Sequence, residues 1–355
     1  MIRLSILRFA GLAGTALKSN ISVLERPYKL NFSITYMCQS RCVTCNIWQI
    51  RPKGELSIEE IREFAAKNNY FKWIELTGGE PFLRSDIVEI AEAFQDNSKS
   101  LYILTFPTNS LCDPKLVERK IRAILDLGIP RVAVTVSLDG YRELHDRIRG
   151  IAGNYDRAIA TYKMLKQLRK TYKNLYFVFG YTLSGFNQGQ FRRTYEEAAK
   201  EIPGLTVNDF HINLAQTSDN YYKNGNDKIK PDPAIALSDV EWALDNRSVE
   251  FGAIPMVERA FLKGLTQYAR TGSAPMRSRS LEASLFLDSF GNVYPSIMWD
   301  RKIGNIRDFR YDLSAMWHNE LAELTRTEIM QGREPNCWTS CEAYQTITGR
   351  ITSML

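Results

Sequence analysis

Histidine and cysteine are scarce in this chain, with 3 and 6 residues, respectively, among 355. Such a low cysteine density argues against a disulfide framework, which is dense in cysteine where it stabilises small secreted domains. Three of the cysteines nevertheless stand close together, at Cys38, Cys42 and Cys45. A zinc site would need a fourth ligand, usually from a second Cys or His pair, and the first histidine, His145, lies far along the chain. A structural zinc site is therefore disfavoured as well.

A strong excess of one charge is absent, and so is a long apolar run. Lys plus Arg number 46 against 40 for Asp plus Glu, and because the basic residues are dispersed we expect no nucleic-acid partner. The apolar amino-terminal stretch, residues 1–19, is interrupted by Arg8, which makes it too short to span a bilayer and a poor secretory signal. It fits an amphipathic helix that either packs on the protein or makes peripheral contact with a membrane surface.

The clustered cysteines follow a C-x3-C-x2-C spacing directly after an apolar, strand-like run. Three thiolates on one short loop can hold three irons of a cubane iron–sulfur cluster. The fourth iron then has no protein ligand and is open to a small molecule, whereas a cluster for simple electron transfer is normally closed by four cysteines. A chance grouping of buried cysteines is the alternative. Because a thiolate-held cluster needs a reducing compartment, the spacing also predicts a cytoplasmic location, with or without membrane association.

Short strand-like runs alternate with helix-like stretches between about Leu30 and Gln216. Helix starts are marked by a capping box at Ser57 and Glu60 and by Pro114 at a first helical position. Six β–α repeats predict an α/β fold, a partial (β/α)6 barrel, and such barrels place chemistry at the carboxyl ends of their strands. The expected strands, rich in β-branched or aromatic residues, are Leu30–Thr35, Trp73–Thr77, Leu101–Thr105, Val132–Ser137, Leu175–Thr182 and Phe210–Ala215.

Two further motifs, each directly after an expected strand, combine glycines with polar side chains. Paired glycines let a backbone approach a ligand without a Cβ clash and offer amide and carbonyl groups to a charged amine. A hydroxyl and an arginine at strand ends suit a carboxylate and ribose hydroxyls. Taken singly, each motif is also compatible with a turn, a cap or a surface ion pair. The motifs are Gly78-Gly79-Glu80-Pro81 and Ser137-Leu138-Asp139-Gly140 with His145, Asp146 and Arg149.

In order and spacing, the three motifs resemble those of the radical S-adenosylmethionine (SAM) enzymes, over roughly Leu30 to Gln216. The resemblance implies a [4Fe–4S] cluster whose open iron is chelated by SAM. It implies reductive cleavage to a 5′-deoxyadenosyl radical that abstracts hydrogen from a substrate, and an electron donor such as ferredoxin or flavodoxin. It further implies Cys38, Cys42 and Cys45 as cluster ligands, and Gly78, Gly79, Glu80, Pro81, Ser137, Arg149, Thr182 and Asn187 as SAM contacts.

One position departs from that family's pattern. The residue before the last cysteine is usually aromatic in the family, and here it is Thr44. A neighbouring side chain such as that of Trp48 then packs against the adenine of SAM, or this packing is looser.

The carboxyl-terminal part is similar to the SPASM or twitch extension of radical SAM enzymes, through residues 290–295, Ile303–Ile306 and Cys337-x3-Cys341. Where those extensions commonly place a cysteine after Tyr-Pro, this chain has Ser296. The similarity implies a small α+β extension that has lost its auxiliary cluster. A second site at Cys337 and Cys341, completed by oxygen or nitrogen ligands or by Cys112, is the alternative. The expected organisation is an amino-terminal segment (1–27), a radical SAM core (28–216), a linker with helices (217–274) and the extension (275–355).

Further inferences leave alternatives open. Alternation in the sixth strand puts His211 and Asn213 on one face, near a substrate, although a satisfied core histidine is the commoner outcome. Tyr221, in a polar segment, lines the barrel mouth or the surface. The substrate is a peptide, a lipid or another small metabolite, and its product cannot be read from the chain. The alternative function is a non-catalytic iron–sulfur or SAM-binding barrel that has lost turnover.

Overall fold

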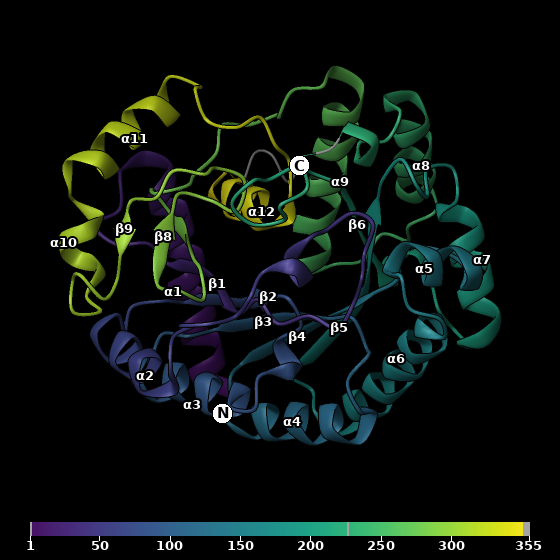
Figure 1. Ribbon diagram of the computed structural model, residues 1–355, viewed down its shortest axis with the longest axis horizontal. Coiled ribbons are helices and arrows are strands. Elements are labelled where there is room, and N and C mark those ends of the chain that lie inside the picture. The colour runs from purple at the N-terminus through teal and green to yellow at the C-terminus, as the bar shows by residue number, and fades with distance from the viewer. Residues whose placement is uncertain (1, 226, 351–355) are drawn as a thin grey trace.

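The computed structural model describes residues 2–225 and 227–350, which form an α/β barrel that is open on one side (Figure 1). A 9-stranded sheet runs in the order β6-β5-β4-β3-β2-β1-β7-β8-β9. Pairing is parallel from β6 to β7 and antiparallel from β7 to β9. The strands are β1 Lys29–Thr35, β2 Trp73–Gly78, β3 Ile103–Thr108, β4 Arg131–Ser137, β5 Leu175–Leu183, β6 Phe210–Leu214, β7 Ser284–Leu287, β8 Asn292–Tyr294 and β9 Gly304–Asn305.

The six predicted parallel strands are confirmed, and the sheet that they form is a partial barrel rather than a closed one. The third strand differs most from its prediction, because it begins at Ile103 and continues through Pro107 to Thr108. The helices between the parallel strands cover the outer face of the sheet, and the chain has further helices before and after them. The bounds of all the described helices are as follows: α1 Ile2–Ile21, α2 Ile58–Lys67, α3 Ile87–Asn97, α4 Pro114–Asp126, α5 Arg142–Arg149, α6 Asn154–Thr171, α7 Phe191–Glu201, α8 Pro233–Asp245, α9 Ala253–Thr271, α10 Leu313–Trp317, α11 Glu320–Met330 and α12 Ser340–Gly349, with short 3-10 turns η1 Ile47–Gln49, η2 Pro81–Leu83, η3 Val207–Asp209 and η4 Asp227–Ile229.

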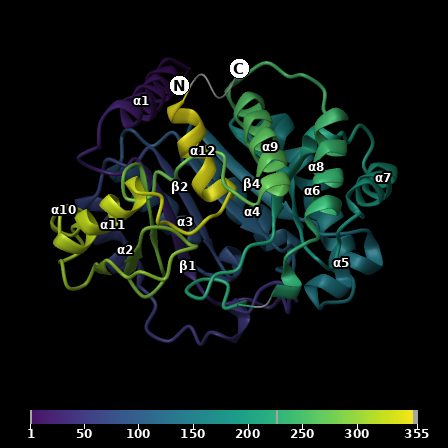
Figure 2. The ribbon, with the colours of Figure 1, turned by 90° about the horizontal axis from the view of Figure 1, so that it is seen from above.

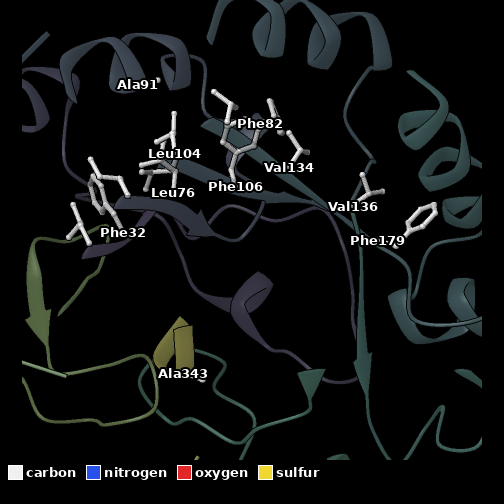
Figure 3. Packing of buried hydrophobic residues seen from close by; sticks show 14 of the residues in the cluster. Phe32, Leu76, Phe82, Ala91, Leu104, Phe106, Val134, Val136, Phe179 and Ala343 are labelled. Carbon is white, nitrogen blue, oxygen red and sulfur yellow. The ribbon is translucent and has the colours of Figure 1, made fainter. Parts of the chain in front are cut away.

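Alternation along the strands separates an outer core from an inner lumen. In β2, β3 and β4 every second residue is fully buried against the helices, and the residues between them are partly accessible from the lumen. Figure 3 shows Leu76, Leu104 and Phe106 pointing from the sheet toward the helices. The inner positions include small polar side chains, such as those of Thr105 and Thr135. The sequence thus builds a packed outer layer and leaves space inside the sheet.

Helix α12 lies inside the curve of the sheet, next to α9 (Figures 1 and 2). Its attachment to the first strand is polar and buried, since Lys29 Nζ donates to the carbonyl oxygen of Cys341 at 2.6 Å and to Gln345 Oε1 at 3.1 Å. On the other side, the backbone N–H of Ser340 donates to Asn213 Oδ1 at 3.3 Å. Helix α12 therefore bridges β1 and β6 across the open side of the barrel.

The carboxyl-terminal hairpin extends the barrel sheet directly. Strand β7 pairs in parallel with β1, with Lys29 opposite Ser284 and Phe32 opposite Leu287. Strands β7 and β8 form an antiparallel hairpin, with Phe286 opposite Tyr294. The extension and the barrel thus share one hydrogen-bonded sheet.

Helix α1 packs against the amino-terminal ends of β2 and β3. Leu12 is buried, Lys72 Nζ donates to the carbonyl oxygen of Gly11 at 3.1 Å, and Arg8 Nη1 donates to the carbonyl oxygen of Leu101 at 3.0 Å. Leu7 on the same helix is exposed. Over the part of the chain that the structure describes, no helix has the length and apolarity needed to cross a bilayer.

Candidate cofactor site

A cavity of about 240 Å³ lies at the carboxyl ends of the strands and is called the upper cavity below. It collects residues from the loops that follow β1, β2, β3, β4 and β6, and from the end of β5. Of the predicted site residues, the ones that line it are Cys38, Cys42, Cys45, Gly78, Gly79, Glu80, Ser137, Arg149 and Thr182. Pro81 and Asn187 are not part of its lining.

The cysteine loop is fastened to the carboxyl end of α5 by two backbone hydrogen bonds. The N–H of Arg41 donates to the carbonyl oxygen of Arg149, and the N–H of Val43 donates to that of Ile148, both at 2.9 Å. Gly150 ends this helix at φ +68°, and a Cβ there would lie 2.6 Å from the carbonyl oxygen of Arg41. A glycine is therefore needed where the helix passes under the loop.

Two of the three thiols accept hydrogen bonds, one from the residue that follows β3 and one from the last residue of α5. Asn109 Nδ2 donates to Cys38 Sγ and Arg149 Nη1 donates to Cys42 Sγ, each at 3.7 Å. Burial raises the pKa of Cys38 to about 11 and that of Cys45 to about 12. Across the described residues, no three Cys, His, Asp or Glu side chains are close enough to hold a single metal ion. A cubane cluster takes each thiolate to a different iron.

Gly78 and Gly79 allow the second strand to end against the cysteine loop. A Cβ on Gly78, which has φ +128°, would lie 2.0 Å from the carbonyl oxygen of Thr35, and one on Gly79 would lie 2.1 Å from that of Met37. The close approach that needs glycine is therefore to β1 and its loop. Tyr221 OH also reaches this point, accepting from the N–H of Gly78 and donating to its carbonyl oxygen, both at 3.1 Å.

Glu80 is buried beneath the upper cavity and holds the end of β3. Its carboxylate accepts from the N–H of Asn109 at 2.7 Å, from Thr108 Oγ1 at 3.1 Å and from the N–H of Phe82 at 3.3 Å. Burial raises the pKa of Glu80 to about 7 in spite of these donors. Pro81 follows as the first residue of η2. Both side chains fix the loops around the site.

Arg149 and Asp139 form a buried ion pair at the edge of the upper cavity. Arg149 Nη2 lies 2.6 Å from Asp139 Oδ2, with side-chain exposures of 14% and 4%. Burial alone would lower the pKa of Arg149, but Asp139 and the neighbouring thiols outweigh it and raise the pKa. The other carboxylate oxygen, Asp139 Oδ1, accepts from the N–H of Thr182 at 2.8 Å. This carboxylate therefore ties together the ends of β4, α5 and β5.

The rest of the second motif supports that pair. His145 is buried, its Nδ1 accepts from the N–H of Asp139 at 3.0 Å, and burial lowers its pKa well below the ordinary value, so the ring is neutral. Asn187 is buried too, and its Nδ2 donates to the carbonyl oxygens of Asp139 at 2.8 Å and of Thr182 at 3.0 Å. Asn187 thus braces the loop after β5, while Ser137 and Thr182 face the cavity.

Several lining residues were given no site role by the sequence reasoning. Asn109 was missed because the third strand was predicted to end at Thr105, three residues too early. Asp139 lay within a quoted motif, but no sequence signal showed that it pairs with Arg149. Tyr221 is buried at the mouth of the barrel, which is one of its two predicted positions.

Cys337 and Cys341 lie in different surroundings. Cys341 lines the upper cavity and its Sγ donates to Glu75 Oε1 at 3.4 Å, whereas Cys337 lines a separate pocket with Tyr268. Burial raises the pKa of both thiols. Cys112 is buried elsewhere, and its Sγ accepts from Gln39 Nε2 at 3.4 Å.

An open parallel barrel with a three-thiol loop at the carboxyl ends of its strands defines a cofactor-binding α/β protein. Residues 32–198 match the model of the Radical SAM superfamily. Residues 32–198 therefore carry a domain of the Radical SAM superfamily, whose members are enzymes. Membership implies a [4Fe–4S] cluster and SAM as the cofactors.

The curated relatives are similar to part of the chain. The AdoMet-dependent heme synthase of Methanosarcina barkeri is 29% identical over 197 residues, which cover 54% of this chain and 52% of that protein. The GTP 3′,8-cyclase of Edwardsiella ictaluri is 32% identical over 145 residues, or 37% of this chain and 42% of that protein. The chain thus spans about half the length of the curated relatives it matches.

Solved structures share the fold over most of the chain. SuiB from Streptococcus suis bound to S-adenosylmethionine superposes with a TM-score of 0.58 at 18% identity, covering 90% of this chain and 72% of SuiB. Native anSMEcpe with bound AdoMet and the Cp18Cys peptide gives a TM-score of 0.58 at 15% identity, covering 93% and 98% of the two chains. At these identities the likeness concerns the fold alone.

Proposed function

We propose that this chain is a radical SAM enzyme that abstracts hydrogen from a substrate bound in its barrel. The supporting observation is that three thiols from one loop and four strand-end segments line a single cavity. When bound, the cluster and SAM would supply a 5′-deoxyadenosyl radical. The chain's own contribution is to hold these groups in one orientation and to exclude water around them.

The residues present fit these cofactors. Cys38, Cys42 and Cys45 would hold three irons of the cluster, which leaves the fourth iron facing the upper cavity. Next to them, Arg149 Nε and Trp48 Nε1 are buried and have no hydrogen-bond partner within the described ranges. Buried polar atoms are normally paired, so both point to a polar ligand in the upper cavity.

Around that ligand, the strand ends would share the binding. The segment Gly78–Pro81 would receive its amino group, with Glu80 and Pro81 holding the loops in place. Ser137 and Thr182 would contact the ribose or carboxylate. Arg149 would balance negative charge through its buried guanidinium, and Asn187 would act as a positioning residue behind Thr182. Trp48 would pack on the adenine in place of an aromatic residue at Thr44.

The domain boundaries and partners are part of the same proposal. Residues 28–216 would form the catalytic barrel, between an amino-terminal segment (1–27) and a linker with helices (217–274), and 275–355 a SPASM-like extension without an auxiliary cluster. Cys337 and Cys341 face different pockets, which supports one cluster per chain. A ferredoxin or flavodoxin would reduce that cluster in the cytoplasm. Residues 1–27 would provide peripheral membrane contact.

The test is anaerobic reconstitution with iron and sulfide, followed by reduction and an assay for 5′-deoxyadenosine released from SAM. We expect release from the wild-type chain and none from a variant with Cys38, Cys42 and Cys45 changed to Ala. Cluster-loaded protein that binds SAM without releasing deoxyadenosine would instead identify a non-catalytic barrel. Equal release from both chains would contradict the assignment of the thiols.

A further inference from the structure

A second cavity, of about 500 Å³, fills the other half of the barrel and is called the lower cavity below. This volume lies within the range of small-molecule sites. It is bounded by the amino-terminal halves of the strands, by α1 and α12, and by the start of α9. None of the predicted cluster or SAM residues belongs to its lining, whereas His211, which was expected near a substrate, does.

The two cavities occupy successive inward positions of the same strands. Thr77 lines the upper cavity and Glu75, two residues earlier, lines the lower one; Ser137 and Thr135 are related in the same way. Ser340 at the start of α12 lines both. Because inward residues recur every second position along a strand, the two cavities are stacked halves of one lumen.

The lower cavity is mainly apolar. Trp73, Ile103, Ala133 and Val178 project from four neighbouring strands, and Phe9 of α1 closes the far end. Such a lining suits a hydrocarbon chain better than a peptide, whose backbone groups would need hydrogen-bond partners inside the lumen.

The polar groups on one wall of the lower cavity satisfy one another. His211 Nδ1 lies 3.0 Å from Glu258 Oε1, Tyr344 OH also donates to Glu258, and Arg247 Nη2 is 3.5 Å from the same carboxylate. Asn213 contacts His211 Nε2 at 2.7 Å. Arg247 Nε is buried and makes no hydrogen bond to any described residue, while the other polar groups of this wall are paired without a ligand.

A further arginine, Arg131, lines the lower cavity. It is the first residue of β4 and lies at the amino-terminal end of the lumen, where it is partly exposed. Its Nε is buried and makes no hydrogen bond to any described residue. A guanidinium at the mouth of an apolar cavity suits a carboxylate or phosphate at the end of a hydrocarbon chain.

Exposed apolar side chains surround the same mouth. Gly252–Pro255 at the start of α9 and Phe9 of α1 both line the lower cavity. Directly before that segment, Phe251 is 97% exposed, and on α1 Leu7 is 62% exposed. Helix α1 carries basic residues and no acidic ones, so its charge complements an anionic membrane surface.

We infer that the lower cavity binds the hydrocarbon chain of an anionic amphiphile, with the charged group at Arg131 and the chain extending toward the upper cavity. This ligand would be the substrate class of the proposed enzyme, and in that respect the inference rests on the proposed function. The lumen would then expose an unactivated C–H bond of the chain to the upper cavity, with its anionic end held at the mouth.

Binding can be measured on the chain without cluster or SAM, using the fluorescent fatty acid cis-parinaric acid. Ala133→Phe fills the lower cavity and is expected to weaken binding about tenfold or more, since at least two methylenes lose their buried contacts. The matched control is Ala160→Phe, on an exposed position of α6, which should bind like wild type. Val178→Phe fills the cavity from another strand and guards against a folding defect in the first variant.

The role of Arg131 separates an anionic ligand from any apolar one. Palmitate should displace the probe better than hexadecanol from the wild-type chain, and Arg131→Gln should remove that preference. Absence of saturable probe binding, or unchanged binding in both cavity-filling variants, would overturn the inference. That outcome would not affect the test of deoxyadenosine release. If deoxyadenosine is not released but the probe still binds, only the proposed function is contradicted.

Vesicles distinguish a membrane lipid from a free fatty acid as the source of the chain. If the source is a bilayer, the protein should sediment with phosphatidylcholine–phosphatidylglycerol vesicles, and Phe251→Ser should reduce the bound fraction. Leu324→Ser, at a half-exposed apolar position of α11, is the control and should leave it unchanged. Probe binding without vesicle binding identifies a free fatty acid as the source. If the protein binds neither the probe nor the vesicles, the inference is refuted.

Discussion

Replacing Arg149 by Met tests whether the buried pair with Asp139 supports the cofactor site. The guanidinium and the carboxylate are 2.6 Å apart and both side chains are mostly buried. Removing one partner of a buried pair leaves an uncompensated charge and typically costs about 3–5 kcal/mol. We therefore expect Arg149→Met to lower the free energy of unfolding by about 3 kcal/mol or more.

The double variant Asp139→Asn, Arg149→Met makes the prediction specific. It removes both charges and keeps an oxygen that can accept from the N–H of Thr182, so it should be more stable than Arg149→Met alone, with a coupling energy of about 2 kcal/mol. As a control, Arg192→Met removes an exposed pair with Glu196 and should cost less than about 1 kcal/mol.

The measurement is urea unfolding of the reduced, metal-free chain, followed by circular dichroism. If Arg149→Met stays within about 1 kcal/mol of wild type, the pair does not carry the energy assigned to it. If the free energy of unfolding of the double variant falls by the sum of the losses for Asp139→Asn and Arg149→Met measured singly, the two side chains act independently and the reasoning is refuted.

Three further predictions concern backbone strain, pH and iron. Gly78→Ala should lower the free energy of unfolding by at least about 3 kcal/mol, because its Cβ would lie 2.0 Å from a backbone oxygen of β1. The control is Gly128→Ala, which is also at positive φ but in open space and should cost about 1 kcal/mol. Both are measured by urea unfolding. Burial alone would raise the pKa of Glu258, but its cationic neighbours outweigh burial and lower the pKa to about 2. The ionised carboxylate therefore stabilises the fold above pH about 4.5, and this contribution is lost as the pH falls toward 2. Glu258→Gln should reduce the dependence of the free energy of unfolding on pH over this range by up to about 3 kcal/mol. Changing Cys337 and Cys341 to Ala should leave the iron content per chain unchanged, and loss of iron would indicate a second cluster.

Most of the barrel could be predicted because its strands are short, apolar and regularly spaced. Five of the six expected strands agree with the structure to within one residue at each end. The third does not, since it runs through Pro107 to Thr108, although proline is rare within a central strand. The β3–β4 register nevertheless includes Pro107, paired with Thr135. Sheet context there outweighs the local preference of proline.

The polar interior of the site was less predictable. The spacing of the cysteines identified three thiols that do line one cavity. The supporting contacts, such as Glu80 with Asn109 and Asp139 with Arg149, join residues from different strands. Such pairs depend on how the strand ends meet in space, and a single sequence carries no signal for them.

The lumen itself was the least visible feature in the sequence. Its lower half is lined by residues such as Ala133 and Val178 that also read as ordinary strand residues. Only the position of α12 inside the sheet shows that these positions face a cavity. His211, expected near the substrate or in a satisfied core network, lines the lower cavity while fully paired with Glu258.

The central claim is that Cys38, Cys42 and Cys45 hold a cluster with one iron open to SAM. Electron paramagnetic resonance of the reduced, anaerobically reconstituted chain tests it most directly, alongside iron and sulfide analysis. The account predicts about four irons per chain and a cluster signal that changes when SAM is added. A chain without such a cluster, or a signal that stays the same at saturating SAM, would contradict it.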